Sequence, residues 1–285
     1  MLYPTSKDWL ESRNRRVALF GMSGLGKTHV SNMLRDGGGW FHYSVDYRIG
    51  TRYMGEHIVD NFKREAMKVP FLRDLLRSDS IYIASNISFT NLAPLSTYLG
   101  KPGDPQKGGI PFAEYARRQE QHREAEIAAL MDTPLFIGKA RDIYGYDHFV
   151  ADTGGSICEV IDHDDPADPV LGTLTASVLL VRIEEGPGHV EELTRRFDRA
   201  PKPMYYRPEV LERNASDYLA ETGLSEDAVD PDDFIRWSFR RLIEDRRARY
   251  AAMARHGVTV SADEIAQVRD EDSFTALIAS AIDRA

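Results

Sequence analysis

Short runs of apolar, β-branched and aromatic residues alternate along the chain with longer stretches in which apolar residues recur at helical spacing. Apolar runs that end in a turn or at a helix start are typical of buried strands in a parallel sheet covered by helices. Five runs fit this pattern, so the sequence predicts an α/β fold with a five-stranded parallel sheet. The predicted strands are Arg16–Phe20, Trp40–Val45, His148–Ala151, Val178–Ile183 and Val258–Val260.

The interval between the second and third predicted strands is far longer than the others. A crossover between parallel strands needs only about a dozen residues. Two helices are predicted within this interval, Ile58–Arg77 and Phe112–Met131, with a surface loop rich in Gly and Pro between them. We therefore expect a single domain over residues 1–285 that carries an inserted region at about 60–140.

A second irregular stretch follows the fourth predicted strand, at residues 195–208. Pro201 and Pro203 flank Lys202 and exclude a regular helix there. The chain is predicted to close with an amphipathic helix, Phe274–Ile282.

The first predicted strand leads directly into a G-x-x-x-x-G-K-[ST] motif that is followed by a predicted helix. In this context glycines let backbone N–H groups turn inward around phosphates, and the helix presents its positive N-terminal end. A glycine-rich turn with no ligand would not need the Lys-Thr pair after its last glycine. The motif therefore predicts ATP binding by Gly21, Met22, Ser23, Gly24, Leu25, Gly26, Lys27 and Thr28, with the lysine serving the β- and γ-phosphates and the threonine hydroxyl serving Mg²⁺.

A carboxylate on a neighbouring strand is expected to complete the magnesium site. The third predicted strand ends in Asp152, which is our candidate for this role. The alternative is that Asp152 only caps the turn Thr153–Ser156 or the helix that follows it.

The order of these motifs resembles the shikimate kinase group of P-loop small-molecule kinases. In that family a D-x-D motif ends the second strand, R-x-x-E lies on a helix, T-G-G-G ends the third strand, and an arginine-bearing lid follows. The counterparts here are Ser44 to Asp46, Arg117 to Glu120, Thr153 to Ser156, and the stretch from Arg195 to Arg207. The segment Glu244 to Tyr250 and the strand after it resemble the family's last long helix and final strand.

The resemblance implies a three-layer P-loop NTPase fold with an inserted helical substrate-binding region at about 60–140 and a lid at about 195–210. It implies that Asp46 orients or deprotonates the acceptor hydroxyl, although Asp46 can also be a helix cap. Arg48 could face the same pocket. Gly154 and Gly155 fall in the substrate turn of the family.

The resemblance also places Arg117 and Arg246 at an anionic acceptor, because a guanidinium group binds a carboxylate or phosphate in a bidentate manner. Both residues lie in charge-rich helices, where solvated ion pairs are the common alternative. Among the lid cations, Arg199 is the first choice to reach the γ-phosphate, and the other lid cations could simply be solvated.

The departures from the family pattern concern the metal and the substrate. Ser44 stands where the family has the first aspartate of D-x-D, Asp152 stands where it has a small residue, and Ser156 replaces the third glycine. We therefore expect the metal carboxylate to have moved to the third strand. Shikimate itself is not implied as the substrate, since the insertion is longer than the family's substrate region.

Composition narrows the partners and the compartment. The 285 residues, 42% of them hydrophobic, can bury a sizeable core, and the net charge of −9 argues against broad nucleic-acid or anionic-membrane surfaces. One cysteine, an N-terminus without the apolar core of a signal peptide, and no apolar run long enough to cross a bilayer favour a cytoplasmic protein that lies outside membranes. The oligomeric state stays open.

These observations favour an ATP- and Mg²⁺-dependent kinase that transfers the γ-phosphoryl group to a small anionic metabolite. The alternative is an ATPase or nucleotide-dependent switch whose inserted region binds a protein. The two classes differ in whether a phosphorylated small product forms.

Overall fold

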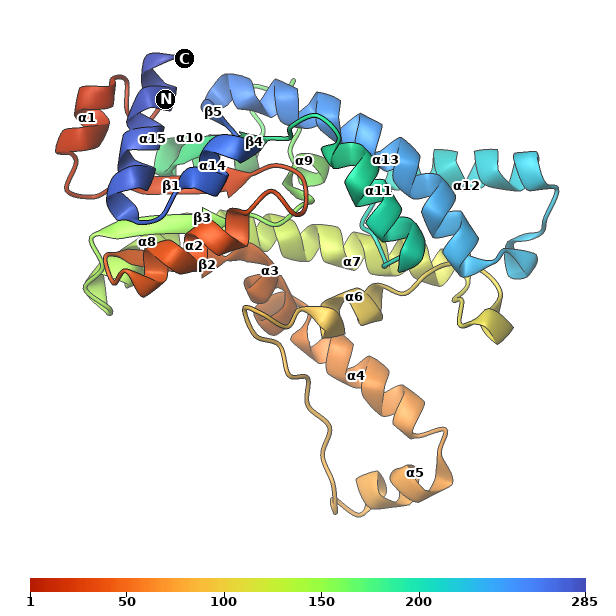
Figure 1. Cartoon of the computed structure of the whole chain (residues 1–285). Helices are drawn as coiled ribbons and strands as arrows, with labels where there is room; N and C mark the ends of the chain where they lie inside the picture. The colour runs from red at the N-terminus through yellow and green to blue at the C-terminus, as the bar shows by residue number, and fades with distance from the viewer. The chain divides into compact units, whose positions relative to one another are not determined.

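The computed structural model describes all residues 1–285, and the chain divides into two compact units (Figure 1). Unit 1 consists of Met1–Val45, Glu126–Ala200 and Ser238–Ala285, and unit 2 consists of Asp46–Ala125 and Pro201–Trp237. The predicted boundaries of an inserted region at 60–140 and a lid at 195–210 stay predictions.

Unit 1 contains a five-stranded parallel sheet, as the apolar runs predict. The strand order is β2-β3-β1-β4-β5, and every neighbouring pair is parallel. Apart from shifts of one residue at strand ends, the predicted strands are confirmed as β1 (Arg16–Phe20), β2 (Trp40–Ser44), β3 (His148–Asp152), β4 (Leu179–Glu184) and β5 (Val258–Ser261).

Helices cover both faces of this sheet. Successive side chains of a strand point to opposite faces. On β2, Trp40 packs against Phe274 of α15 (Glu271–Asp283), whereas Phe41 and Tyr43 pack against Phe136 of α8 (Thr133–Asp142). The other helices wholly within unit 1 are α1 (Ser6–Glu11), α2 (Lys27–Asp36), α9 (Ile157–Val160), α10 (Pro169–Ser177), α11 (His189–Arg199) and α14 (Ala262–Gln267).

The strand order defines where a ligand can bind. The connection that leaves β1 leads to β2 on one side of the sheet, and the connection that leaves β4 leads to β5 on the other side. In open α/β sheets, ligands bind outside the carboxyl ends of the strands at the point where such connections diverge. The carboxyl end of β1, between β3 and β4, is therefore the expected position of a site.

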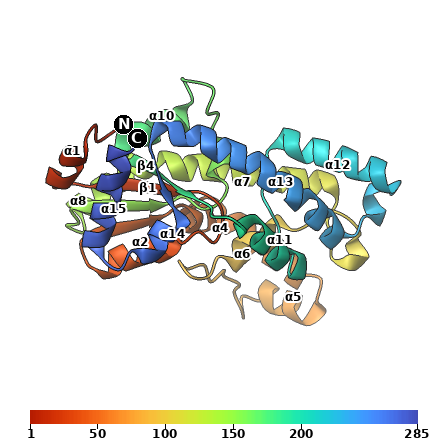
Figure 2. The same ribbon diagram turned by 45° about the horizontal axis from the view of Figure 1, so that its top comes forward.

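Unit 2 is helical, and its core is built from aromatic side chains. Phe234 packs edge-on against both Phe112 and Tyr218. Figure 1 and Figure 2 show α12 running beside the first part of α13. The unit holds α3 (Val45–Arg48) from Asp46 on, α4 (Gly55–Ala66), α5 (Pro70–Arg77), α6 (Ala93–Leu99), α12 (Pro208–Thr222), and the first parts of α7 (Phe112–Met131) and α13 (Pro231–Met253).

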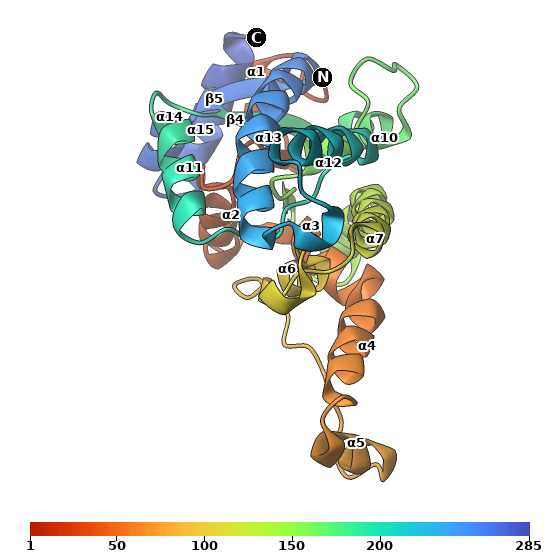
Figure 3. The same ribbon diagram turned by 90° about the vertical axis from the view of Figure 1, so that its right-hand side faces the viewer.

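The predicted helix Phe112–Met131 is confirmed residue for residue, but the predicted helix Ile58–Arg77 is wrong. Two helices, α4 and α5, occupy that range and are separated at Met67–Val69. Pro70 begins α5, because proline has no N–H to donate and is tolerated at the first helical position but not in a helix interior. Figure 3 shows α5 at the far end of α4 from α6 and α7.

The two predicted irregular segments are partly helical. Leu95, Tyr98 and Leu99 are buried on α6, so the first part of the Gly- and Pro-rich segment is a helix rather than a surface loop. Likewise α11 extends to Arg199, and the irregular stretch begins only at Ala200. In both segments the apolar residues are buried by neighbours distant in sequence, which local composition does not indicate. None of the helices combines the length and the apolar character that a membrane span requires.

Candidate functional site

The loop after β1 has a backbone that only glycine adopts readily. Gly21, Gly24 and Gly26 have φ values of 136°, 83° and 93°. A Cβ atom on Gly21 would lie 2.5 Å from the carbonyl oxygen of Ile183 on β4. The glycines of the motif are therefore required by the shape of the loop and by its close approach to the neighbouring strand.

Lys27, the first residue of α2, is held inside this loop. Lys27 is only 6% exposed. Its Nζ donates hydrogen bonds to the carbonyl oxygens of Gly21 at 2.8 Å and Met22 at 2.7 Å. A buried ammonium group needs such polar partners. The positive charge expected from the motif thus lies at the loop itself.

Thr28 and Asp152, the two predicted metal ligands, are in direct contact. The Thr28 hydroxyl donates to Oδ2 of Asp152 at 2.5 Å. Asp152 is buried at the carboxyl end of β3, in register with Leu19 of β1 and Ser44 of β2. Its Oδ1 also accepts from the N–H of Gly154 at 3.4 Å, so the same carboxylate contacts both α2 and the following turn.

The turn after β3 lies against the glycine loop. A Cβ atom on Gly155 would be 3.8 Å from the backbone nitrogen of Ser23. The hydroxyl of Thr153 donates to the carbonyl of Leu19 at 2.9 Å. Two side chains of α13 hold the turn from the other side, since Arg246 Nη1 and the Tyr250 hydroxyl both donate to the Gly155 carbonyl, at 2.8 and 2.7 Å.

Arg246 already has a carboxylate partner inside unit 1. Its Nε lies 2.7 Å from Oε1 of Glu159, and both side chains are buried. Burial of the guanidinium acts to lower its pKa, but Glu159 and other neighbouring groups raise the pKa of Arg246 above its ordinary value. The charge that the family resemblance assigns to an acceptor is therefore used here to hold the segment that follows β3.

Glu126 is a site residue that the sequence did not single out. It is fully buried on α7, and its Oε1 accepts a hydrogen bond from the Ser156 hydroxyl at 2.8 Å. One indication of this contact was present in the sequence, because Ser156 stands where the family pattern has its third glycine. A polar residue at the turn needs a buried partner, but nothing local identifies which residue of a polar helix supplies it.

Asp46, Arg48 and Arg117 lie in unit 2. Asp46 is in the first turn of α3 rather than before a helix, and the Arg48 guanidinium lies over the ring of Tyr53 at 5.4 Å. Arg117 forms two hydrogen bonds of 2.8 Å with Glu114, and its side chain is 48% exposed. Hydrogen bonds from Arg117, and from its neighbour in sequence, lower the pKa of Glu114 to about 2 although partial burial opposes this.

The next residue, Arg118, is buried where Arg117 is not. It donates to Glu114 at 2.7 Å, to the carbonyl oxygen of Tyr98 at 2.5 Å and to Oδ1 of Asn61 at 3.1 Å. Its guanidinium also stacks over the Tyr98 ring at 4.8 Å. Arg118 is therefore structural within unit 2, and Arg117 is the arginine of the R-x-x-E counterpart that solvent reaches.

Helix α11 brings a different arginine to the glycine loop from the one expected. Nε2 of His189 lies 3.2 Å from the carbonyl oxygen of Ser23. The Nη2 atom of Arg196 lies 3.7 Å from the position that a Cβ on Gly24 would occupy. Arg199, favoured by the sequence, is exposed about one turn further along α11.

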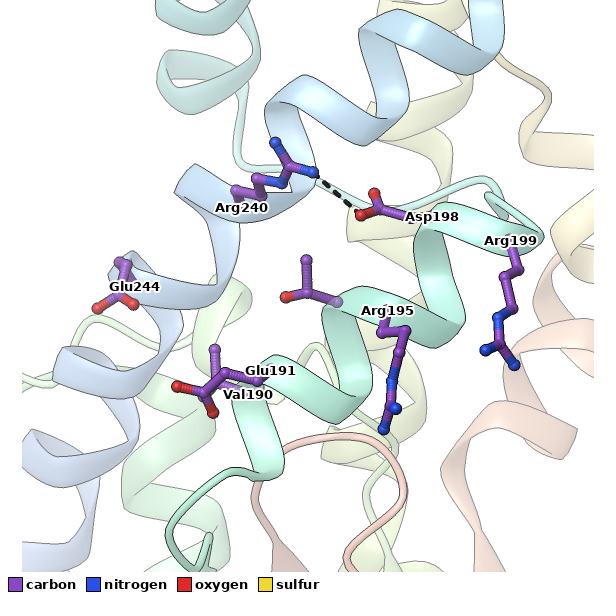
Figure 4. Close-up of a pocket in the computed structure, with 8 residues that line it drawn as sticks. Val190, Glu191, Arg195, Asp198, Arg199, Arg240 and Glu244 are labelled. Carbon is purple, nitrogen blue, oxygen red and sulfur yellow. Dashed lines mark hydrogen bonds and ion pairs between the residues drawn. The ribbon is translucent and has the colours of Figure 1, made fainter.

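A groove of about 630 Å³ separates α11 from α13 (Figure 4). The two helices are joined across it by the ion pair between Arg240 and Asp198 at 3.0 Å and by the stacked rings of Phe197 and Phe239, 3.6 Å apart. Phe197 is the one buried residue of α11. The groove is lined by Val190, Glu191, Thr194, Arg195, Asp198, Arg199, Arg240 and Glu244.

The residues around the loop fit a phosphate ligand with Mg²⁺. Hydroxyl and carboxylate oxygens are ligands that Mg²⁺ prefers, and Mg²⁺ usually takes one or two protein oxygens and shares the rest with phosphates and water. Thr28 and Asp152 provide such a pair. No cluster of three or more His, Cys, Asp or Glu side chains could hold a metal without that help.

Comparisons of the chain with protein-family models, with curated proteins and with solved structures find no match. The chemistry of the site is therefore inferred from its own residues.

Proposed function

We propose that this chain is a P-loop kinase, similar to the shikimate kinase group, that binds ATP with Mg²⁺ and transfers the γ-phosphoryl group to a small anionic metabolite. The single observation that carries the proposal is the contact between Thr28 and Asp152 beside the Gly21–Thr28 loop. A turn without a ligand has no need of a lysine, a hydroxyl and a carboxylate gathered at the carboxyl end of its central strand.

The loop would bind the phosphates of ATP. Backbone N–H groups of the glycine-rich segment and the N-terminus of α2 would face the phosphate oxygens, and Lys27 would exchange its carbonyl partners for the β- and γ-phosphates. Bound Mg²⁺ would neutralise charge on the transferring group. Thr28 and Asp152 would hold the ion from the protein side.

Transfer would then depend mainly on positioning and charge. Arg196 is supported as the cation that approaches the γ-phosphate, because its Nη2 lies 3.7 Å from the position of a Cβ on Gly24. Glu192, which ion-pairs with Arg196 at 3.3 Å, would keep that guanidinium extended along the helix. Asp46 would orient the acceptor hydroxyl, since it follows β2 two residues after Ser44.

The proposed anionic acceptor rests on Arg117. The side chain of Arg117 is 48% exposed, and that of its ion-pair partner Glu114 is 30% exposed, so an incoming anion could replace Glu114. Arg246 would contribute indirectly, by fixing the Gly155 carbonyl and Glu159.

The test is a two-stage assay on the full chain. Calorimetry first measures ATP affinity with and without Mg²⁺, and a library of phosphorylatable metabolites is then screened for ADP release. A kinase gives slow ADP release alone, faster release with one acceptor, and a phosphorylated small product. Fast ADP release with no phosphorylated product under any acceptor would replace the kinase with the ATPase or switch, and no ATP binding would remove both.

A further inference from the structure

The glycine loop turns three successive carbonyl groups toward side-chain donors. Lys27 holds the carbonyls of Gly21 and Met22. His189 holds the next one, that of Ser23, at 3.2 Å. A carbonyl oxygen only accepts hydrogen bonds, so Nε2 of His189 must carry a proton. His189 is the first residue of α11, it belongs to unit 1 together with the loop, and the kinase reaction described so far gives it no role.

The contact fixes the orientation of one peptide group. In a planar trans peptide, the C=O of one residue and the N–H of the next point in opposite directions. The Ser23 carbonyl points to His189, so the N–H of Gly24 points away from that side chain. This N–H donates to no acceptor of the chain. An unused backbone donor in such a loop is suited to bind a phosphate oxygen.

His189 and Arg196 meet the same glycine from one face of α11. They are seven residues apart, which is close to two full helical turns, so their side chains leave the helix in nearly the same direction. A Cβ atom on Gly24 would lie 3.8 Å from Cε1 of His189 and 3.7 Å from Nη2 of Arg196. Two side chains of one helix therefore lie against the residue whose N–H is unused.

Building on the proposed ATP site, we propose that His189 is a positioning residue for the phosphates. By holding the Ser23 carbonyl, it directs the N–H of Gly24 toward a phosphate oxygen of ATP. Lys27 would release its loop carbonyls when it binds the phosphates, whereas His189 would keep its carbonyl throughout. A donor that is aimed before the ligand arrives lowers the cost of binding. The imidazole thus acts through the peptide group.

Calorimetry of the full chain with ATP and Mg²⁺ is the first test. His189→Phe keeps an aromatic ring but has no donor, and it should weaken ATP binding about tenfold, the effect of one hydrogen bond to a charged group. His189→Gln supplies an amide N–H donor and should restore most of the affinity. A role in packing alone would be met better by Phe than by Gln. Binding by His189→Phe as tight as by the wild type, or by His189→Gln as weak as by His189→Phe, would overturn the proposal.

His256→Phe is the matched control. His256 is an exposed histidine of unit 1 in the short helix Ala254–His256, away from the glycine loop in sequence. ATP affinity should not change in this variant, and matching circular dichroism spectra would show that all variants fold. An equal loss of affinity in His256→Phe would contradict a specific role for His189. If the wild type binds no ATP, the proposed function fails together with this role, whereas equal binding by the wild type and His189→Phe removes the role alone.

The kinetics separate His189 from Arg196. Arg196 is proposed to act on the transferring group, so its loss should lower kcat, whereas the loss of His189 should act mainly on ATP affinity. A His189→Phe variant with normal ATP affinity and a lowered kcat would mean that the histidine only anchors α11. That result would overturn the proposal.

The hydrogen bond can also be tested without nucleotide. Long-range ¹H–¹⁵N spectra of the full chain report which ring nitrogen of a histidine carries the proton. The signals of His189 are assigned by their loss in His189→Gln. A proton on Nε2 is expected, and a proton on Nδ1 alone would overturn the proposal.

Discussion

Lys27 and Thr28 are neighbours in sequence, and the structure separates their contacts. The ammonium group of Lys27 points into the loop, whereas the hydroxyl of Thr28 points to Asp152. Successive residues at the start of a helix diverge by about 100°. One short motif therefore presents two different polar groups, an ammonium and a hydroxyl, in different directions.

Replacing Lys27 by Ala should weaken ATP binding about 10- to 100-fold, the loss expected for one or two charge-assisted hydrogen bonds. Thr28→Ala should instead reduce the gain in affinity that Mg²⁺ provides. Calorimetry with ATP, in the presence and absence of Mg²⁺, measures both effects. Unchanged ATP affinity and turnover in the Lys27 variant would remove the proposed phosphate site.

Asp152→Asn should raise the Mg²⁺ concentration needed for half-maximal activity more than Asp46→Asn does. The reason is that Asp152 touches the Thr28 hydroxyl, and an amide lacks the negative charge that Mg²⁺ requires. A magnesium titration of both variants provides the measurement. The opposite ranking would leave Asp152 as a residue that supports the turn.

Arg196→Ala should lower the rate of phosphoryl transfer by about 10- to 100-fold while changing ATP affinity little, because its charge would matter most in the transition state. Arg199→Ala is the control, since Arg199 lies on the same helix but further from the glycine loop. The measurement is kcat with saturating ATP. Equal losses in the two variants would show that α11 acts through its overall charge and not through one guanidinium.

The contact between Thr28 and Asp152 was predictable from sequence, and the approach of Arg196 to the glycine loop was not. Thr28 and Asp152 sit at fixed offsets from strands that the apolar runs reveal, and parallel strands bring their carboxyl ends to one edge. Arg196 and Glu126 are positioned by the rotation of helices within the tertiary fold. In helices rich in charge, several residues satisfy the same local pattern, so spacing alone cannot choose among them.

At the scale of elements, α9 and α13 are joined by the buried ion pair between Glu159 and Arg246. Removing one member leaves the other charge buried without compensation, which typically costs about 3–5 kcal/mol. Arg246 also satisfies the Gly155 carbonyl, so the turn beside the glycine loop depends on the same side chain.

Arg246→Ala should therefore lower the free energy of unfolding by about 3–5 kcal/mol in urea denaturation. Arg117→Ala is the comparison, since its ion pair with Glu114 is half-exposed and should contribute about 0–1 kcal/mol. If acceptor recognition depends on Arg117, this second variant should instead raise the acceptor KM. A small stability loss at Arg246 would mean that Glu159 finds another partner.

The elements themselves were predictable to different degrees. The five strands and α7 follow from apolar runs and from a long helical stretch without proline. The break between α4 and α5 was missed because the apolar periodicity continues across Pro70, although proline disfavours the helical conformation in the residue before it. The extension of α11 to Arg199 was missed because the prolines that follow it dominate the composition of the segment.

At the scale of the whole molecule, Cys158 can report on unfolding. Burial raises the pKa of its thiol to about 12, so the reactive thiolate is scarce in the folded chain at neutral pH. A maleimide or iodoacetamide reagent at pH 8 should label the native protein at the rate of global opening. The labelling rate of Cys158 should rise over the same range of urea concentration in which the circular dichroism signal is lost. Fast labelling of the native protein would indicate local opening of α9.

The position of β1 in the sheet has a further consequence for how the chain is made. Val17 pairs with Val150 of β3 on one side and with Leu179 of β4 on the other, while β2, the next strand in sequence, lies two places away. Both neighbours of β1 are thus synthesised long after it. Because long-range strand pairing must close large loops first, it is intrinsically slow. A nascent chain that has not yet extended past β4 cannot place β1 between its two neighbouring strands. The glycine loop that follows β1 therefore acquires its shape only in the second half of synthesis.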